Sequence, residues 1–304
     1  MIENTTFCQA NCIVCVRDYL KFEKNNMSQE VFEKGINEVA AFYKKMGKSL
    51  KFVDFGGMGE PLLDNSLERK LKYLKNHHPE IRTGLTTNGG LLTAKKDLLC
   101  NYIDILKISN YGFSKASFEK IHRGSLVYEA VKKNIENFLS INKRPKVIMS
   151  FLMLPENKGE ENSWKEYWES KCEELFIWLP HNWAGYGTSH TDMASGGYRS
   201  CGRPGKDFVI RANGDVSVCC WDFNREMSIG NINTASFEEI CKGKIFEWIM
   251  DMHKNRSFFD YDSPCKHCDQ LFDRTDALIY SSAKNYRIGS RLTAETQLLN
   301  EVCP

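Results

Sequence analysis

The sequence lacks an uninterrupted apolar run of the roughly 18 residues that a membrane span requires. It also lacks a basic block, since 41 Lys and Arg residues stand against 39 Asp and Glu, for a net charge of +2. Phosphate backbones are bound by concentrated positive charge, so neither a membrane nor a nucleic acid is an expected partner. Only seven residues precede the first cysteine, which we interpret as too few for the apolar region of a signal peptide. We therefore expect a cytoplasmic protein.

Internal repeats and low-complexity tracts are also lacking, and 304 residues suffice for one large domain or two modest ones. Cysteine, in contrast, is abundant at twelve residues. A disulfide framework is not expected, because the cytoplasm keeps thiols reduced. Grouped cysteines in such a compartment indicate metal binding instead.

The first group is Cys8, Cys12 and Cys15, spaced C-x3-C-x2-C. Three thiolates within eight residues can bind one side of a four-iron, four-sulfur cluster, which needs four ligands. One iron is then open to an outside ligand, and an open metal position indicates chemistry rather than a structural role. The alternative is a zinc site that a distant residue completes.

Strand-like and helix-like segments alternate along the first 180 residues. Six strands are expected at residues 2–7, 50–55, 81–86, 103–108, 147–154 and 175–179. Helical patterns between them predict a parallel sheet with right-handed crossovers, in which ligands bind at the carboxyl ends of the strands. Periodicity does not distinguish an open sheet from a barrel.

The cysteine spacing, followed by Gly56-Gly57-Met58-Gly59-Glu60-Pro61 after the second strand, resembles the radical S-adenosylmethionine (SAM) superfamily. The resemblance implies an α/β fold with a partial (β/α)6 TIM-like barrel over residues 1–185. It also implies that SAM binds the open iron and is cleaved to a deoxyadenosyl radical, which removes a hydrogen atom from the substrate. The electron for this cleavage would come from a flavodoxin- or ferredoxin-type protein.

Further residues match the SAM-binding positions of this superfamily. In relatives the glycine-rich segment binds the SAM amino group, and Glu60 offers acceptor atoms to an ammonium. Val14 replaces the aromatic residue that often precedes the third cysteine, which alters the packing around the adenine. Asn157, three residues after Leu154, is a further candidate for lining the site. The resemblance implies cofactor-binding roles for Val14, Gly56, Gly57, Met58, Glu60, Pro61, Asn88, Ser109, Arg123 and Leu154.

A second group comprises Cys201, Cys219, Cys265 and Cys268, in the pattern C-x12-G-x4-C followed later by C-x2-C. Four such cysteines can close a metal site, and a structural zinc ribbon is the alternative. The pattern resembles the SPASM/twitch extension of radical SAM enzymes, and the shorter twitch form with one auxiliary cluster fits better. We therefore expect two four-iron, four-sulfur clusters. The extension, residues 186–304, should contain a β-hairpin at Asn213-Gly214 and helices at 235–254 and 275–287.

Size and cysteine layout resemble carbohydrate-directed members, among them the inosamine dehydrogenase of the butirosin pathway and the epimerase of the neomycin pathway. This predicts a small polyhydroxylated substrate (a sugar, aminocyclitol or sugar nucleotide) in antibiotic biosynthesis, with dehydrogenation or epimerisation as the outcome. Cys220 and Cys241 are the candidate catalytic hydrogen donors, and Asn182 and Trp183 are the candidate substrate contacts. The alternatives are a maturase that modifies a ribosomal peptide or protein, and a non-enzymatic zinc or redox-sensing module.

Overall fold

In a computed structural model, the fold is described for residues 1–186, 195–274 and 277–283. Its centre is a six-stranded sheet in the order β1-β2-β3-β4-β5-β11. The first five strands are parallel, whereas β11 pairs antiparallel with β5. These strands are β1 (Phe52–Phe55), β2 (Arg82–Thr87), β3 (Ile105–Ser109), β4 (Lys146–Leu152), β5 (Glu174–Trp178) and β11 (Leu278–Ser281).

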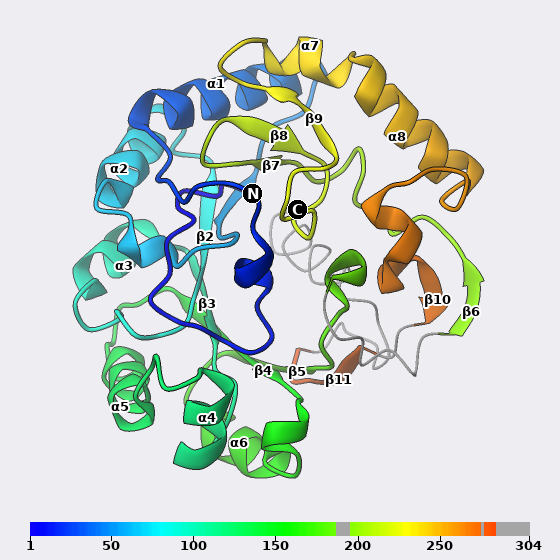
Figure 1. The fold of residues 1–304 in the computed structure, drawn as a ribbon. Helices are drawn as coiled ribbons and strands as arrows, with labels where there is room; N and C mark the ends of the chain where they lie inside the picture. The colour runs from blue at the N-terminus through cyan, green and yellow to red at the C-terminus, as the bar shows by residue number, and fades with distance from the viewer. Residues whose placement is uncertain (187–194, 275–276, 284–304) are drawn as a thin grey trace.

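Six helices lie along the outer side of the curved sheet and form an arc around it (Figure 1). Their apolar residues recur at helical spacing, as Leu67, Leu71 and Leu74 do, and these side chains are buried. Helices between the strands supply the crossovers that parallel pairing needs. The six are α1 (Gln29–Lys45), α2 (Leu67–His77), α3 (Lys96–Tyr102), α4 (Lys115–Ile121), α5 (Tyr128–Leu139) and α6 (Glu161–Trp168). The predicted α/β fold with a partial barrel is confirmed.

The segment predicted as the first strand, residues 2–7, is not a strand; it joins two sheets. The amide of Ile2 donates to the Asp54 carbonyl at 2.8 Å, and the amide of Glu3 donates to the Ile210 carbonyl at 2.9 Å. These contacts form only isolated bridges, with Phe55 on one side and Ile210 on the other. The first residues therefore connect the barrel to the C-terminal part of the protein. We call residues 1–3 the seam.

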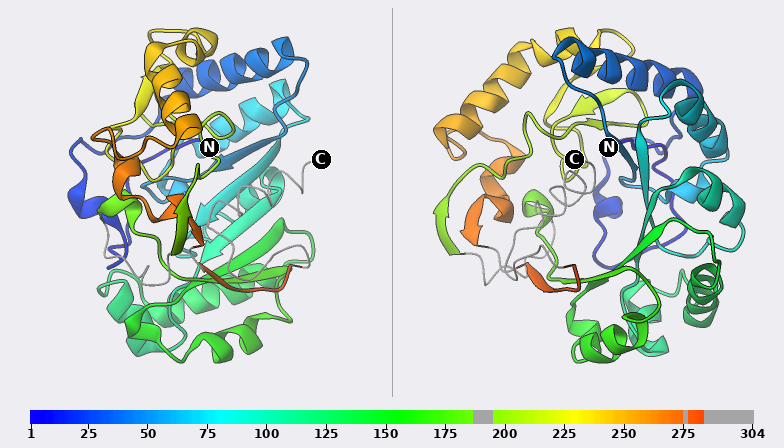
Figure 2. Two further views of the ribbon diagram at one scale, coloured as in Figure 1. Left: turned by 90° about the vertical axis from the view of Figure 1, so that its right-hand side faces the viewer. Right: turned by 180° about the vertical axis from the view of Figure 1, so that it is seen from behind.

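Beyond the seam lies a three-stranded antiparallel sheet of β7 (Val209–Ile210), β8 (Asp215–Ser217) and β9 (Ser228–Asn231). The predicted hairpin at Asn213-Gly214 is present, with Gly214 at φ +91°, where glycine is favoured. The predicted helical stretch at 235–254 forms two helices, α7 (Phe237–Cys241) and α8 (Lys244–Asn255). Figure 2 shows from two further sides that both continue the arc of α1.

The predicted helix at 275–287 is wrong where the structure describes it, because residues 278–281 form strand β11. The Leu278 side chain is fully buried with Phe176 and Trp178 of β5, so the edge of the barrel sheet outweighs the local helical pattern. Strand β11 is therefore the edge strand of the barrel sheet, although its residues belong to the predicted second domain. The remaining strands, β6 (Ser195–Tyr198) and β10 (Phe272–Arg274), pair with each other.

The division of the chain at residues 185 and 186 stays a prediction, because much of the segment around it lies outside the described residues. Across the helices that the structure describes, none combines the length and apolar character needed to traverse a bilayer.

Candidate active site

A cavity of about 670 Å³ lies inside the barrel, and we call it the barrel cavity. This volume is in the range of pockets that bind small ligands, about 300–1,000 Å³. Its walls come from the strands of the barrel, the seam and the loop between β8 and β9. Among the predicted site residues it is lined by Val14, Gly56, Gly57, Met58, Ser109, Trp183 and Cys220.

The first cysteine group lies on a loop fixed to helix α4 and to its own backbone. The amide of Ile13 donates to the Ile121 carbonyl at 2.8 Å, and the amide of Cys15 donates to the Cys12 carbonyl at 3.1 Å. The pKa of Cys12 is raised to about 12, chiefly by burial and also by the neighbouring charges of Cys15 and Cys8. The three thiols are thus close enough to repel one another as thiolates. A bound cation would remove this penalty, which is how cysteines bind metals.

Asn88 is next to this loop, and its role toward SAM stays a prediction. Its side-chain Nδ2 lies 3.9 Å from the Cys8 sulfur, and its Oδ1 accepts a hydrogen bond from Gln9 Nε2 at 3.1 Å. Strand β2 ends at Thr87, one residue earlier. The carboxyl end of β2 therefore positions an amide beside the first cysteine.

Gly57 needs to be glycine for two reasons. Its φ of +133° is in the region that other residues rarely adopt, and an added Cβ would lie 2.7 Å from Glu3 Cγ. The next amide, that of Met58, donates to Glu3 Oε2 at 3.2 Å. The glycine-rich loop therefore packs closely on the seam.

Glu60 is buried, and its carboxyl group is engaged by the protein. Oε1 accepts from Thr87 Oγ1 at 2.8 Å and from the Leu62 amide at 3.3 Å, while Oε2 accepts from the Asn88 amide at 2.8 Å. Burial raises the pKa of this carboxyl to about 7, although these three hydrogen bonds lower it. Glu60 therefore joins the loop after β1 to the end of β2. Its contact with the SAM amino group stays a prediction.

This raised pKa predicts a pH dependence of stability. The unfolded carboxyl, with a pKa near 4.5, ionises before the folded one, so stability should fall as pH rises from about 4.5 to 7. The Glu60 contribution to this fall is about 3 kcal/mol, because one pKa unit is about 1.4 kcal/mol. We expect Glu60→Gln to lack this component. Urea unfolding of both proteins at several pH values checks the difference, and parallel curves would contradict it.

The remaining predicted SAM contacts lie outside the lining of the barrel cavity. Arg123, at the end of α4, forms an exposed ion pair with Asp18 at 3.0 Å. Leu154 is buried, and its amide donates to Asn157 Oδ1 at 2.7 Å, so Asn157 caps the turn after β4. Pro61 begins the short turn after Glu60. Their roles toward SAM stay predictions.

The second cysteine group lines one small cavity, which we call the cysteine cavity. Cys219 follows strand β8, and Cys265 lies on the 3-10 turn of residues 264–267, so separate elements bring the thiols together. The pKa of Cys219 is raised to about 12, chiefly by burial and also by the nearby Cys220. The lining includes Cys201, Cys219, Cys265, Cys268, Arg203, Trp221 and His253.

The donor set of the cysteine cavity fits a cluster. All eleven cysteines in the described part of the chain are free thiols. No three His, Cys, Asp or Glu side chains there converge closely enough for a single metal ion. A four-iron, four-sulfur cluster takes each cysteine on a different iron, so its ligands line a volume instead of meeting at one point. Four cysteines around one cavity match this requirement.

His253 belongs to the cysteine cavity and was not predicted. Its Nε2 lies 3.5 Å from the Cys265 sulfur, and its Nδ1 lies 3.0 Å from Ser200 Oγ. Burial lowers the pKa of His253 to about 4, so it is neutral at pH 7. A sequence signal for its burial was available, because His253 lies four residues after Ile249, on the buried side of helix α8.

Two predicted residues are not where their proposed roles need them. Cys241 ends helix α7, which packs on α1, and it lines neither cavity, so a role as hydrogen donor is not supported. Asn182 is buried outside the barrel cavity lining, and its Nδ2 donates to the His267 carbonyl at 2.7 Å. Its amide group therefore anchors the C-x2-C turn, and the geometry gives it no substrate contact.

Trp183 does line the barrel cavity, and it also connects the two halves of the site. Its indole Nε1 donates to the Val14 carbonyl at 3.0 Å, within the first cysteine loop. Its backbone amide donates to His181 Nδ1 at 3.1 Å. The predicted substrate residue thus also positions the first cluster loop.

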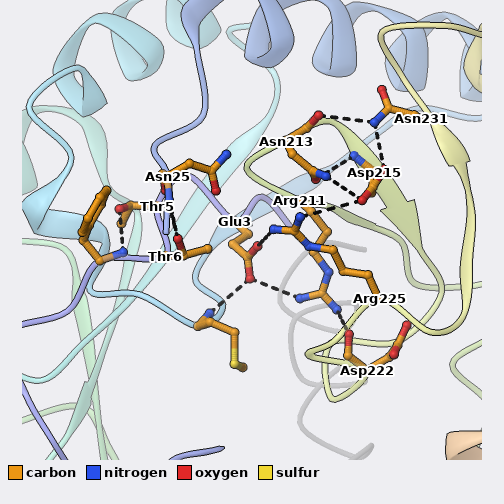
Figure 3. Close-up of polar contacts among 12 residues, drawn as sticks. Glu3, Thr5, Thr6, Asn25, Arg211, Asn213, Asp215, Asp222, Arg225 and Asn231 are labelled. Carbon is orange, nitrogen blue, oxygen red and sulfur yellow. Dashed lines mark hydrogen bonds and ion pairs between the residues drawn. The ribbon is translucent and has the colours of Figure 1, made fainter. Parts of the chain in front are cut away.

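A buried ionic network fixes the seam to the second cysteine group. Glu3 lies between the guanidinium groups of Arg211 and Arg225, at 3.2 and 3.7 Å (Figure 3). Arg211 also donates through Nη2 to the Cys219 carbonyl at 2.8 Å. Since Glu3 accepts from the Met58 amide as well, one chain of contacts connects the glycine-rich loop to Cys219.

The fold and the two cysteine groups define an iron–sulfur enzyme built on a partial barrel. The family model of the radical SAM superfamily matches residues 2–164, more than half of the chain, and that of the SPASM iron–sulfur cluster-binding domain matches residues 201–269. The chain belongs to the radical SAM superfamily. Its cofactors are accordingly SAM, the four-iron, four-sulfur cluster that binds SAM, and auxiliary iron–sulfur chemistry in the SPASM domain.

Individual relatives are distant. The chain is 28% identical over 92 residues to the tungsten-containing aldehyde ferredoxin oxidoreductase cofactor-modifying protein of Pyrococcus furiosus, a match to 30% of this chain and 24% of that protein. BtrN in complex with AdoMet and 2-DOIA is similar in structure, with a TM-score of 0.59, 20% identity and coverage of 88% of this chain and 90% of BtrN. Streptococcus suis SuiB bound to the precursor peptide SuiA has a TM-score of 0.63 and 16% identity, with coverage of 91% and 70%.

Proposed function

We propose that this radical SAM enzyme removes a hydrogen atom from a small polyhydroxylated molecule held in the barrel cavity, with epimerisation or dehydrogenation as the outcome. When bound, SAM and its cluster supply the one-electron chemistry that breaks an unactivated C–H bond. The protein's own residues bind the substrate, orient it and exclude water. The observation that carries the proposal is that an aromatic wall and polar strand residues line the same cavity.

His181, Trp183 and Trp221 form this aromatic wall. The His181 ring stacks on Trp221 with centroids 4.2 Å apart, and Trp183 lies 4.5 Å from His181. Because His181 Nδ1 accepts the Trp183 amide, the neutral ring carries its proton on Nε2 and can donate to a hydroxyl. Burial lowers the pKa of His181 to about 3, which keeps the ring neutral.

The other lining residues suit the polar edge of such a substrate. They come from strands β2, β3 and β4 and carry hydroxyl or ammonium groups, namely Thr86, Lys107 and Ser150. Aromatic rings bind the flat apolar face of a sugar or cyclitol, whereas these groups can hydrogen-bond its hydroxyls. A sugar, an aminocyclitol or a sugar nucleotide meets both requirements.

Cys220 is the candidate hydrogen donor. Its side chain lines the barrel cavity, and its sulfur lies 3.2 Å from Arg203 Nη1. A thiol that returns a hydrogen atom to the opposite face of the substrate carbon inverts that carbon. Dehydrogenation needs instead the loss of one further electron and one proton from the substrate.

The test compares the wild type with Cys220→Ala and the matched control Cys241→Ala. Each reconstituted protein is incubated without oxygen in D2O with SAM, reductant and sets of aminocyclitols, aminosugars and sugar nucleotides. We expect substrate-dependent deoxyadenosine from all three proteins. If the outcome is epimerisation, the wild type and Cys241→Ala incorporate one deuterium at unchanged connectivity, whereas Cys220→Ala does not.

Other results are equally decisive. A loss of two mass units from the substrate indicates dehydrogenation and removes the donor role of Cys220. Deoxyadenosine formation that only a peptide stimulates would contradict the small-molecule proposal and favour a maturase. That second reading is supported by the structural similarity to peptide-bound proteins, namely SuiB with its precursor peptide and anSMEcpe with AdoMet and a peptide. We propose a flavodoxin- or ferredoxin-type protein as the reductant.

A further inference from the structure

The barrel cavity and the cysteine cavity share two lining residues in the described part of the chain, Arg203 and Trp221. These two side chains also contact each other, because the Arg203 guanidinium lies 4.4 Å from the Trp221 ring centroid. Trp221 also stacks on His181, with ring centroids 4.2 Å apart. Trp221 therefore contacts both Arg203 and His181, and the first pair belongs to the wall that the two cavities share.

Arg203 has unusual surroundings for a buried arginine. Its Nη1 donates to the Cys220 sulfur at 3.2 Å, and its Nε is buried without a hydrogen-bond partner. Within the described residues it forms no ion pair with a carboxylate. The acidic groups that act electrostatically on it are the thiols of Cys220, Cys219 and Cys201 and the carboxyl group of Asp207.

A buried charge is costly unless an opposite charge compensates it. Two of the nearby thiols, those of Cys201 and Cys219, are proposed ligands of the auxiliary cluster. Four thiolates give such a cluster a net negative charge, and its net charge and hydrogen bonds set its reduction potential. A guanidinium in the wall of the cluster cavity would stabilise the reduced form, which is the more negative one.

We propose that Arg203 is the counter-charge of the auxiliary cluster and raises its reduction potential, and that the stack with Trp221 fixes this charge in the wall shared with the substrate. The inference rests on the proposed ligand set of Cys201, Cys219, Cys265 and Cys268. It makes Arg203 a positioning residue, which acts through the cluster and need not contact the substrate.

The experiment measures the potential of the auxiliary cluster alone. A variant with Cys8, Cys12 and Cys15 changed to alanine removes the ligands of the first cluster, and its remaining iron is quantified first. Into this background we introduce Arg203→Gln, the charge-retaining Arg203→Lys, and the control Arg144→Gln. Arg144 pairs with Glu173 at 2.9 Å before β4 and lines neither cavity. Anaerobic potentiometric titrations followed by electron paramagnetic resonance then give each potential.

We expect Arg203→Gln to shift the reduction equilibrium at least tenfold toward the oxidised form, a fall of about 59 mV for one electron. Arg203→Lys and Arg144→Gln should stay close to the background. If Arg203→Gln loses the cluster while Arg203→Lys and Arg144→Gln keep it, the result also supports the inference, because the cluster then requires the positive charge at position 203.

An unchanged potential in Arg203→Gln would overturn the inference. Equal falls in the Gln and Lys variants, or loss of the cluster from both, would do the same, because they indicate shape and not charge. Iron absent from the triple-alanine background has a different meaning. It would contradict the proposed auxiliary ligand set before Arg203 is tested.

Discussion

Replacing Cys12 with alanine is expected to abolish the cleavage of SAM and to remove the iron of the first cluster, leaving the auxiliary iron bound. Cys12 is the central thiol of the first group. Its burial opposes ionisation and raises its pKa to about 12. Such a thiol becomes a thiolate when a metal replaces its proton. Two cysteines cannot supply the three ligands that leave one iron open. Iron and sulfide analysis, with deoxyadenosine measured after anaerobic reduction, checks both effects.

Cys100 provides the matched control. It lies on helix α3, is half-buried, and lines neither cavity. Cys100→Ala should keep the wild-type iron content and SAM cleavage. If Cys12→Ala retained both, the first cysteine group would not be the SAM-binding cluster site.

The largest expected effect on stability belongs to Arg211→Met. The Arg211 and Glu3 side chains are both fully buried, and their ion pair spans 208 residues of sequence. Removal of the arginine leaves the Glu3 charge buried and also frees the carbonyls of Cys219 and Asp222, which Arg211 Nη2 contacts at 2.8 Å each. Loss of one partner of a buried pair costs about 3–5 kcal/mol. Anaerobic urea unfolding measures the change.

Two further variants separate the ion pair from other causes. Arg69→Met, on the exposed side of α2, should change stability by no more than about 0.5 kcal/mol. The double variant Glu3→Gln with Arg211→Met should be more stable than Arg211→Met alone, because position 3 is then uncharged while Arg225 keeps its ion pair with Asp215. A double variant as unstable as the single one would attribute the loss to packing.

Local signals predicted most of the barrel. The buried runs that become β1 to β5 and the apolar spacing of α1, α2 and α5 depend only on neighbouring residues. Strand β11 could not be predicted in this way, because Leu278 gains its burial from β5, a hundred residues earlier. The seam was misread as a strand for a related reason. Its composition is strand-like, yet its backbone divides its hydrogen bonds between two different sheets.

Side-chain direction limited the prediction of the site. Cys219 and Cys220 are consecutive, yet the first lines the cysteine cavity and the second lines the barrel cavity. Spacing identified Cys219 as a candidate ligand, whereas only the fold distinguishes which cavity its neighbour faces. Arg203 and His181 carried no spacing signal, because their importance depends on the stack with Trp221. Polar residues without a repeating pattern acquire a role only when distant segments meet.

The seam also has a consequence for biosynthesis. Residues 1–3 are soon followed by their partners at positions 54–58, whereas they are synthesised about 200 residues before their partners at positions 208–211. At about 5–20 residues per second, translation takes about 10–40 s to supply those partners. During this interval the seam beside the cysteine loop has its contacts with residues 54–58 but not those with the hairpin. Delivery of iron and sulfide to the first cluster should accordingly follow synthesis of the hairpin, so that cluster insertion is late relative to translation.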